Sequence, residues 1–185
     1  ENRQIDTVVV ITPSGMHYEH VLDIISLYQK NIIVEKPTFL KVSHVSEVCE
    51  TAKEAGVNVF AVFQNRHNLA VKRVEQGLTS GELGQIRCVS VRVRWCRPQR
   101  YYDMDPWRGT FSMDGGCLTN QGIHHIDLLR RLGGEVRRVC SIHKTLGADI
   151  EVEDTATATI EFQNGITGSL EITTAARPID YEASL

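Results

Sequence analysis

The sequence predicts an α/β fold followed by an α+β fold, because the hydrophobic pattern changes near Gln64. Before that residue, short continuous apolar runs alternate with amphipathic helical patterns, which is typical of parallel strands joined by helices. After it, a strand pattern of period two indicates a sheet with one covered face. We expect residues 1–64 to form half of a Rossmann-type, doubly wound sheet. We expect residues 65–185, incomplete at the C-terminus, to form an α+β domain with a mostly antiparallel open sheet and helices on one face.

The first part of the chain is predicted to be strand, helix, strand, helix, strand. The strands are Ile5–Ile11, Asn31–Val34 and Val57–Phe63. The first helix follows the break at Thr12–Gly15 and keeps its apolar spacing from His17 to Tyr28. The second helix is Val42–Ala55, with Ser43 as its expected N-cap and Gly56 as its end. This order favours a parallel sheet with right-handed crossovers.

In the second part, helices and strands are punctuated by Gly-containing turns. The elements expected are His67–Thr79, Gln85–Arg94, Cys117–Leu132, Val136–Lys144, Thr155–Phe162 and Ile166–Thr173, of which the first and third are helices. Gln163-Asn164-Gly165 predicts a hairpin between the last two strands. Pro98–Gly116 is expected to be a long loop rich in aromatic and charged residues.

Composition limits the classes of partner. The chain has 185 residues, of which 42% are hydrophobic and 23% charged, as in a globular protein with a real core. A net charge of −3 gives no basic field, so we expect no nucleic-acid partner. No apolar stretch reaches the roughly 18 residues of a membrane helix, and no signal peptide is apparent. We therefore expect a cytoplasmic protein without a membrane partner.

The number of cysteines, five, is odd, and no two of them have C-x-x-C spacing. They are Cys49, Cys88, Cys96, Cys117 and Cys140. A thiolate zinc site and a disulfide framework are therefore not expected. Buried, reduced thiols are the simpler interpretation.

A complete doubly wound nucleotide domain begins with a strand and a Gly-rich turn. This chain contains no G-x-G-x-x-G and begins directly at a strand–helix unit. Three parallel strands are also few for such a sheet. We therefore expect that the N-terminal βαβ half is missing, and that this half would contain the side chain that distinguishes NAD from NADP.

Polar residues follow each of the three predicted parallel strands, where open α/β sheets bind ligands. The stretches are Thr12-Pro13-Ser14 with His17, Glu35-Lys36-Pro37, and Gln64-Asn65-Arg66. Pro37 restrains Lys36 to an extended backbone, so the lysine can project over a bound ring or hydroxyl. Two simpler interpretations stay open: Glu35 and Lys36 as a solvated pair, and His17 as a helix residue without a task.

A second group of polar residues lies in GGCLTNQGIHHIDLL, residues 115–129. On one helix, Asn120, His124 and Asp127 would share a face. A half-buried imidazole near an acid suits proton transfer. The glycines within residues 113–116 would allow a ligand to approach closely. A solvent-exposed polar triplet, or a core histidine, is the open alternative.

These motifs, TPSGMH, EKP, WRG, and GG followed by NQGIHHID, resemble in their order the glucose-fructose oxidoreductase, inositol dehydrogenase and rhizopine-catabolism (Gfo/Idh/MocA) family. The resemblance spans essentially the whole chain. It implies a Rossmann domain beside a domain with a large open sheet. It also implies hydride transfer between NAD or NADP and a carbon of a sugar or cyclitol, and a homo-oligomer, dimer or tetramer, formed through the open sheet.

The resemblance also implies roles for single residues. Lys36 matches the lysine that hydrogen-bonds the reacting oxygen, and His124 matches the histidine that acts as acid or base. Many members have an aspartate four residues before that histidine, where this chain has Asn120, so the proton must go to His124 or be shared with Lys36. The residues expected at the cofactor are Thr12, Pro13, Ser14, His17, Glu35, Lys36, Pro37, Asn65, Trp107 and Arg108.

Within the family, residues 64–66, residues 92–103 and the NQGIHHID motif are most similar to the branch that oxidises UDP-linked N-acetylhexosaminuronic acids at the 3-position. Arginines and tyrosines of this region suit an anionic sugar nucleotide. They are Arg66, Arg97, Arg100, Arg108, Tyr101 and Tyr102. The residues expected to bind substrate are Arg66, Arg100, Tyr101, Asn120, Gln121 and His124. The loop is alternatively an oligomer contact or a solvated surface.

Two other functions stay open. A metal-dependent lyase or hydrolase would use His124, His125 and Asp127, but adjacent histidines on a helix diverge by about 100°, so no metal is expected. The chain is alternatively a non-catalytic module that binds a sugar nucleotide or mediates oligomerisation, since the Gly-rich dinucleotide loop is absent from it.

Overall fold

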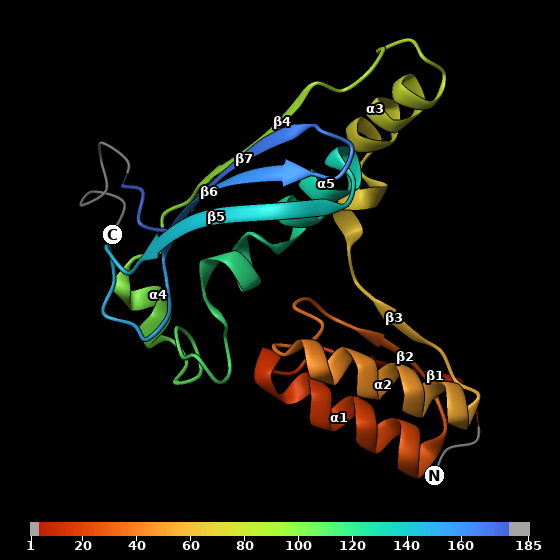
Figure 1. The fold of residues 1–185 in the computed structure, drawn as a ribbon. Coiled ribbons are helices and arrows are strands. Elements are labelled where there is room, and N and C mark those ends of the chain that lie inside the picture. The colour runs from red at the N-terminus through yellow and green to blue at the C-terminus, as the bar shows by residue number, and fades with distance from the viewer. Residues whose placement is uncertain (1–3, 178–185) are drawn as a thin grey trace.

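The computed structural model describes residues 4–177, which form two lobes connected after the third strand (Figure 1). The strands are β1 (Thr7–Val10), β2 (Asn31–Val34), β3 (Val59–Ala61), β4 (Cys88–Arg94), β5 (Val136–Lys144), β6 (Thr155–Phe162) and β7 (Thr167–Thr173). The helices are α1 (His17–Asp23), α2 (Val42–Ala55), α3 (Leu69–Thr79), α4 (Gln99–Asp103) and α5 (Ile123–Gly133). The 3₁₀ and π-helical turns are Ser14–Met16, Ile24–Tyr28, Gln64–His67 and Cys117–Gln121. The predicted succession of a parallel sheet and a second, open sheet is confirmed.

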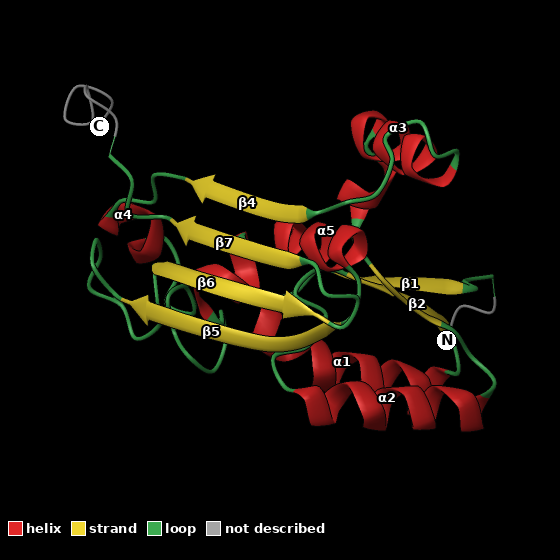
Figure 2. Cartoon of the chain, turned by 45° about the horizontal axis from the view of Figure 1, so that its top comes forward, coloured by secondary structure: helices red, strands yellow, loops and turns green. Residues whose placement is uncertain are grey.

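All three strands of the first sheet are parallel, in the order β1-β2-β3, and α1 and α2 cover one face (Figure 2). Val10, Ile32 and Val34 are buried on that face against the two helices. Val9 and Phe60 lie in one row on the opposite face, and they are 55% and 56% exposed. Continuous apolar runs are typical of strands covered on both faces, but only the helical face is closed within the described residues.

The start of α2 differs from the prediction. Its N-cap is Lys41, which makes no side-chain capping bond, so the assignment of Ser43 as the cap is wrong. The first turn closes through the backbone, where the amide of His44 donates to the carbonyl of Lys41 at 3.2 Å. Gly56 ends the helix at a φ of 67°, a left-handed conformation that glycine adopts without steric cost.

The second sheet has the order β4-β7-β6-β5. Its β5–β6 and β6–β7 pairs are antiparallel, whereas β4 runs parallel to β7, so the sheet is mixed. The hairpin predicted at Gln163–Gly165 joins β6 to β7. Helix α5 packs beneath one face of the sheet, and no described helix covers the other face (Figure 1). Part of the stretch 98–116, predicted to be a loop, is helix α4.

The core of the second lobe lies between the sheet and α5. It consists of Val89, Val93, Cys117, Leu129, Ile160, Phe162, Leu170 and Ile172. All five cysteines are free, and Cys117 is the buried one; Cys96 is half-buried, and the rest are exposed. Burial of all five was therefore a wrong prediction. In β4, Val89 and Val93 face the core, and strand alternation puts Cys88 on the open face.

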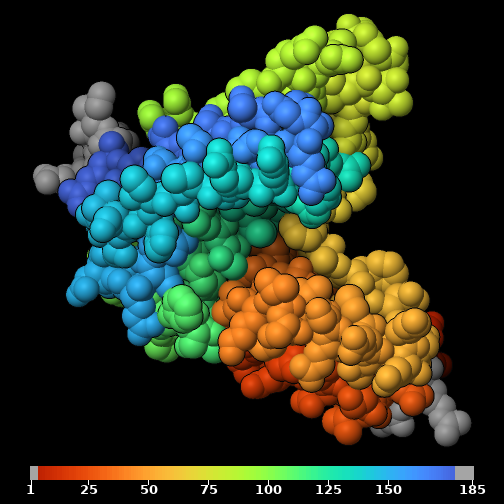
Figure 3. All heavy atoms as spheres, viewed as in Figure 1, coloured from red at the N-terminus to blue at the C-terminus, as the bar shows by residue number. Residues whose placement is uncertain are grey.

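The two lobes touch where the turn after β1 meets the green segment that precedes α5 (Figure 3). The amide of Gly15 donates to the carbonyl of Met113 at 2.9 Å. A Cβ atom at Gly15 would lie 2.5 Å from the carbonyl oxygen of Ser112, so only glycine allows this approach. Within residues 4–177, no helix combines the length and apolar character needed to cross a membrane.

Candidate active site

A cleft of about 410 Å³ lies between the lobes, at the carboxyl ends of β1 and β2. Most residues predicted to bind the cofactor converge there, together with two of those predicted to bind substrate. The predicted residues that line it are Thr12, Pro13, Ser14, His17, Glu35, Lys36, Tyr101, Trp107, Arg108 and Asn120. The strand-end argument therefore located a real cavity, because parallel strands end at one edge of their sheet.

Lys36 extends from the end of β2 to the second lobe. Its Nζ donates to the Asn120 side-chain Oδ1 at 2.6 Å and to the Asn120 backbone carbonyl at 3.2 Å. Burial lowers the pKa of Lys36, whereas the carboxylates of Glu35 and Asp114 oppose that shift. The lysine is therefore partly desolvated and held by two acceptors.

His124 lies near the start of α5, four residues after Asn120. Burial first, and then the charges of Lys36 and His125, lower the pKa of His124. Its Nδ1 atom is buried without a hydrogen-bond partner among the described residues, and the ring stands edge-on to Phe63 at 6.3 Å. The structure thus brings the ammonium and the imidazole into one region, with the imidazole favoured in its neutral form.

His17 is 1% exposed, and both of its ring nitrogens contact backbone carbonyls. Nδ1 lies 2.8 Å from the oxygen of Pro37, and Nε2 lies 2.8 Å from the oxygen of Thr12. The ring therefore ties the end of β1 to the segment after β2, where the Lys36–Pro37 peptide bond is cis. A contact of His17 with the cofactor stays a prediction.

The expected helical face of Asn120, His124 and Asp127 is wrong. Asn120 lies in the π-helical turn that precedes α5, so the α-helical spacing does not hold between it and His124. Its amide faces Lys36, while Asp127 accepts from Arg66 Nε at 2.7 Å and from Arg66 Nη2 at 2.5 Å. Because Arg66 occupies both carboxylate oxygens, Asp127 is not available to a metal beside the two histidines.

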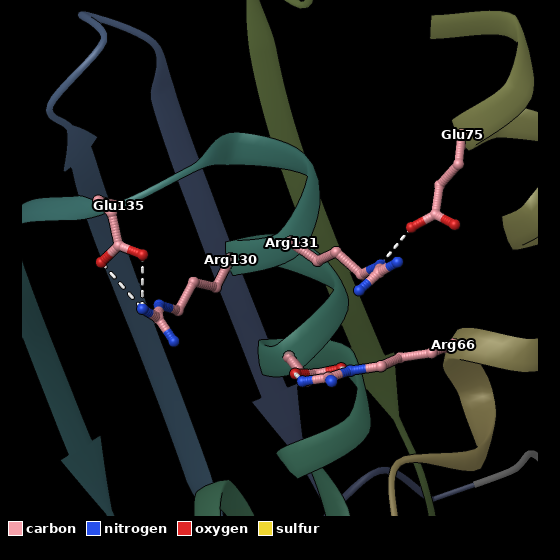
Figure 4. A network of polar contacts seen from close by, with 6 residues as sticks. Arg66, Glu75, Arg130, Arg131 and Glu135 are labelled. Atoms are coloured by element: carbon pink, nitrogen blue, oxygen red, sulfur yellow. Dashed lines mark hydrogen bonds and ion pairs between the residues drawn. The ribbon is translucent and has the colours of Figure 1, made fainter. Parts of the chain in front are cut away.

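Arg66 pairs with Asp127, and Figure 4 shows the Arg66 side chain extending from the segment after β3 toward α5. Its guanidinium also lies 4.7 Å from the centre of the Phe63 ring. Several other predicted site residues are not among those that line the cleft. Arg100 is exposed on α4, Gln121 is buried in the π-helical turn, and Asn65 lies in the 3₁₀ turn after β3. His124, at the start of α5, is not among the residues that line the cleft either.

Cationic and aromatic side chains form a wall in which Tyr101, Trp107 and Arg108 line the cleft, whereas Arg97 and Trp95 are not among the residues that line it. The Arg108 guanidinium lies 4.7 Å from the ring centres of both Tyr101 and Trp107. Arg97 lies 5.0 Å from the Tyr101 ring and 5.3 Å from the Trp95 ring. Stacking of this kind holds planar guanidinium groups in fixed orientations.

Tyr102 does not belong to that wall, although the sequence suggested that it could stack on a ligand. It is 6% exposed, and its hydroxyl lies 3.0 Å from the Thr174 hydroxyl. Burial raises its pKa to about 12. Tyr102 is therefore part of the core.

Asp114 is a site residue that the sequence-based predictions did not include. It is 2% exposed, and its carboxylate accepts hydrogen bonds from the Gly109 amide at 2.7 Å and from the Asn120 side chain. The available signal was an acid directly before two glycines and six residues before Asn120.

Comparison with known proteins places the chain in a family. Residues 1–63 match an oxidoreductase family with an NAD-binding Rossmann fold, and residues 71–183 match the GFO/IDH/MocA C-terminal domain. The chain belongs to the Gfo/Idh/MocA family. The predicted resemblance and the family's nicotinamide cofactor are thereby confirmed.

The curated relatives include dehydrogenases of sugars and cyclitols. D-glucoside 3-dehydrogenase of Escherichia coli is 29% identical over 181 residues, which cover 86% of this chain and 49% of the relative. Myo-inositol 2-dehydrogenase of Thermotoga maritima is 25% identical over 177 residues, which cover 92% of this chain and 50% of the relative. The chain thus spans about half the length of these proteins.

Solved structures agree with this placement. The WlbA dehydrogenase from Bordetella pertussis, in complex with NADH and UDP-GlcNAcA, is 36% identical with a TM-score of 0.91. The match covers 96% of this chain and 51% of that one. GenD2 from gentamicin A biosynthesis, in complex with NAD, is 26% identical with a TM-score of 0.85, and the match covers 96% and 50%. The two lobes therefore share their arrangement with solved structures that contain NADH or NAD.

Proposed function

We propose that the protein containing this chain is an NAD- or NADP-dependent dehydrogenase that oxidises a secondary alcohol of a sugar nucleotide. The candidate substrate is a UDP-linked N-acetylhexosaminuronic acid, oxidised at the 3-position. The observation that carries the proposal is that Lys36 lines the strand-end cleft bound to Asn120, and that His124, four residues after Asn120, lies near enough for the charge of Lys36 to lower its pKa. Gln64 is the proposed boundary between the cofactor domain and the substrate domain.

The residues of the cleft fit one end of a dinucleotide. Thr12 and Pro13 lie at the end of β1, and Trp107 and Arg108 approach from the second lobe, so they would hold the nicotinamide and its ribose. The Gly-rich turn that would bind the pyrophosphate is not in the chain. When bound, the nicotinamide supplies the hydride acceptor.

Residues of the chain itself would accept the proton that the substrate hydroxyl loses. A substrate hydroxyl between Lys36 and His124 would receive a hydrogen bond from the ammonium and give its proton to the imidazole. Lys36 stabilises the negative charge that develops on the oxygen, and a fixed donor of this kind is worth several kcal/mol in a site that excludes water. His124 can accept the proton because its pKa is lowered, which keeps the ring neutral.

The arginine–aromatic wall supports an anionic substrate. Arg97 and Arg108 are held by stacking on Tyr101, Trp95 and Trp107, so their orientation is set before a ligand binds. A fixed guanidinium suits a carboxylate or a diphosphate. The WlbA dehydrogenase, with UDP-GlcNAcA in its structure, adds support for that substrate class.

The test is a substrate screen on a protein that also carries the Gly-rich dinucleotide segment, with formation of reduced cofactor as the readout. UDP-N-acetylglucosaminuronic acid should be oxidised faster than free glucosides or myo-inositol. Lys36→Ala and His124→Ala should each lower kcat by about 10²–10⁴-fold, with little change in the Kd of NADH. Glu82→Gln, in an exposed pair on the far side of α3, is the control. Near-native turnover of both site variants would refute the assignment.

The open face of the second sheet favours a further role in assembly. A shallow hollow of about 430 Å³ lies on it between β4 and β5. One row across this face consists of Ser90, Ser169, Thr159 and Cys140, small side chains that a second copy could pack against. The proposed homo-oligomer predicts that Thr159→Glu lowers the mass measured by light scattering, whereas an unchanged mass would refute it. If the protein bound NADH and sugar nucleotide without turnover, the non-catalytic alternative would stand.

A further inference from the structure

We propose that Asp114 is a positioning residue that acts through the Asn120 amide to hold Lys36 in its reacting orientation. The inference rests on the proposed function, because it assigns Lys36 the contact with the substrate oxygen. It adds a residue that touches neither the substrate nor the cofactor. The basis is an unbroken chain of hydrogen bonds from a buried carboxylate to the ammonium.

The series of hydrogen bonds runs from Asp114 through Asn120 to Lys36. Asp114 and Asn120 are 2% and 8% exposed, so water does not compete for their hydrogen bonds. One carboxylate oxygen of Asp114 accepts from the Gly109 amide at 2.7 Å, and the other accepts from the Asn120 Nδ2. The Oδ1 of Asn120 then accepts from the Lys36 Nζ at 2.6 Å.

Donor and acceptor chemistry fixes the direction in which these hydrogen bonds run. A side-chain amide has a donor end and an acceptor end of nearly the same shape, so Asn120 could turn either way. An ionised carboxylate only accepts, and therefore Asp114 fixes the amide with its donor end inward. The acceptor end is left for Lys36, whose ammonium only donates. If the amide were reversed, two donors would face each other at the reactive lysine.

The charge of Asp114 acts in the same direction. It opposes the effect of burial on the pKa of Lys36, and so favours the ammonium form that donates to the substrate oxygen. The position four residues before His124 holds a neutral amide in this chain. The negative charge therefore lies on Asp114, beyond the Asn120 amide, and it acts on Lys36 through that amide.

The decisive variant is Asp114→Asn, which keeps the shape and removes one acceptor. The new amide at position 114 has a single oxygen for two donors, the Gly109 amide and Asn120. Either the loop bond is lost or Asn120 is forced to reverse. We expect kcat to fall about 10²-fold, because a small misplacement of a reacting group can cost that much. The KM of the sugar nucleotide should change by less than about threefold, since no substrate contact is removed.

A second substitution that restores kcat distinguishes a positioning role of Asp114 from a role that only supports the loop at Gly109. In Asp114→Asn combined with Asn120→Asp, the new amide accepts from Gly109 and donates to the new carboxylate, which accepts from Lys36. Every donor again faces an acceptor, although the bond between positions 114 and 120 now runs in the opposite direction, so we expect kcat within about tenfold of wild type. Asn120→Asp alone puts two carboxylates in contact and should be more impaired than the double variant.

The outcomes are separable. A double variant no more active than Asp114→Asn, or an Asp114→Asn enzyme with near-native kcat, would overturn the inference. Acetylation of Lys36 by acetic anhydride, followed by mass spectrometry, tests the same series of hydrogen bonds without a measurement of turnover. Its rate should rise in Asp114→Asn and return in the double variant, and an unchanged rate would overturn the inference even if no sugar substrate were found. If Asp114→Asn does not fold, the double variant and Asn120→Asp still give the comparison.

Discussion

Two aspartates on either side of the π-helical turn before α5 use their charge in different ways. Asp127 contacts a cation directly, through two bonds to Arg66. Asp114 contacts only neutral donors, and its charge reaches Lys36 through the Asn120 amide. The side chain of Asp127 is 13% exposed, whereas Asp114 is 2% exposed. Two acids thirteen residues apart thus differ in whether their carboxylates contact a cation directly or through a neutral amide.

Arg66 and Asp127 lie in a small network that holds the segment after β3 against α5 (Figure 4). Arg131 of α5 pairs in the same way with Glu75 of α3. Both pairs join residues far apart in sequence, and none of these residues is among those that line the cleft. We therefore expect Asp127 to contribute to stability and Asp114 to turnover.

The largest expected effect is on stability. Asp127→Ala leaves Arg66 without its bidentate partner in a partly buried place, and should lower the free energy of unfolding by about 1–3 kcal/mol. Urea denaturation would measure this loss, with Glu82→Gln as the exposed control. The kcat per folded molecule should stay within about threefold of wild type. A loss of turnover as large as that of Asp114→Asn would remove the distinction between the two acids.

A second, smaller effect concerns Arg66, which was also predicted to bind substrate. If its task is the pair with Asp127, Arg66→Met should cost about 1–2 kcal/mol and should not add to Asp127→Ala in a double-mutant cycle. The KM of the sugar nucleotide should then change by less than about threefold. A rise of KM above about tenfold with unchanged stability would instead support the substrate contact.

The smallest effect is on pH dependence. The pKa of His124 is lowered from its ordinary 6.5 by burial first, and then by Lys36 and His125. The base is the neutral ring, so kcat/KM for alcohol oxidation should be lost only as pH falls through that lowered pKa. The charge of Asp127 raises this pKa, and Asp127→Asn should therefore move the acid limb to lower pH. A pH–rate profile that moved upward would contradict the placement of the two groups.

Much of the fold could be predicted because its signals are local. The apolar runs of β1 and β2 and the Asn-Gly hairpin depend on neighbouring residues. The strand-end rule then located Lys36 in the cleft, because parallel strands finish at one edge. The motif that contains His124 was recognised for the same reason, as a short pattern in one segment.

The sequence by itself thus determined the order of the elements, the family, and the lysine that lines the cleft, whereas the role of the histidine stays a prediction. The tertiary structure decided how the buried polar groups are paired. It joined Asp114 to Asn120 across a π-helical turn, gave Asp127 to Arg66, and placed both nitrogens of His17 on backbone carbonyls. The physical reason is that a buried polar group must find a partner, and that partner depends on which segments meet in space.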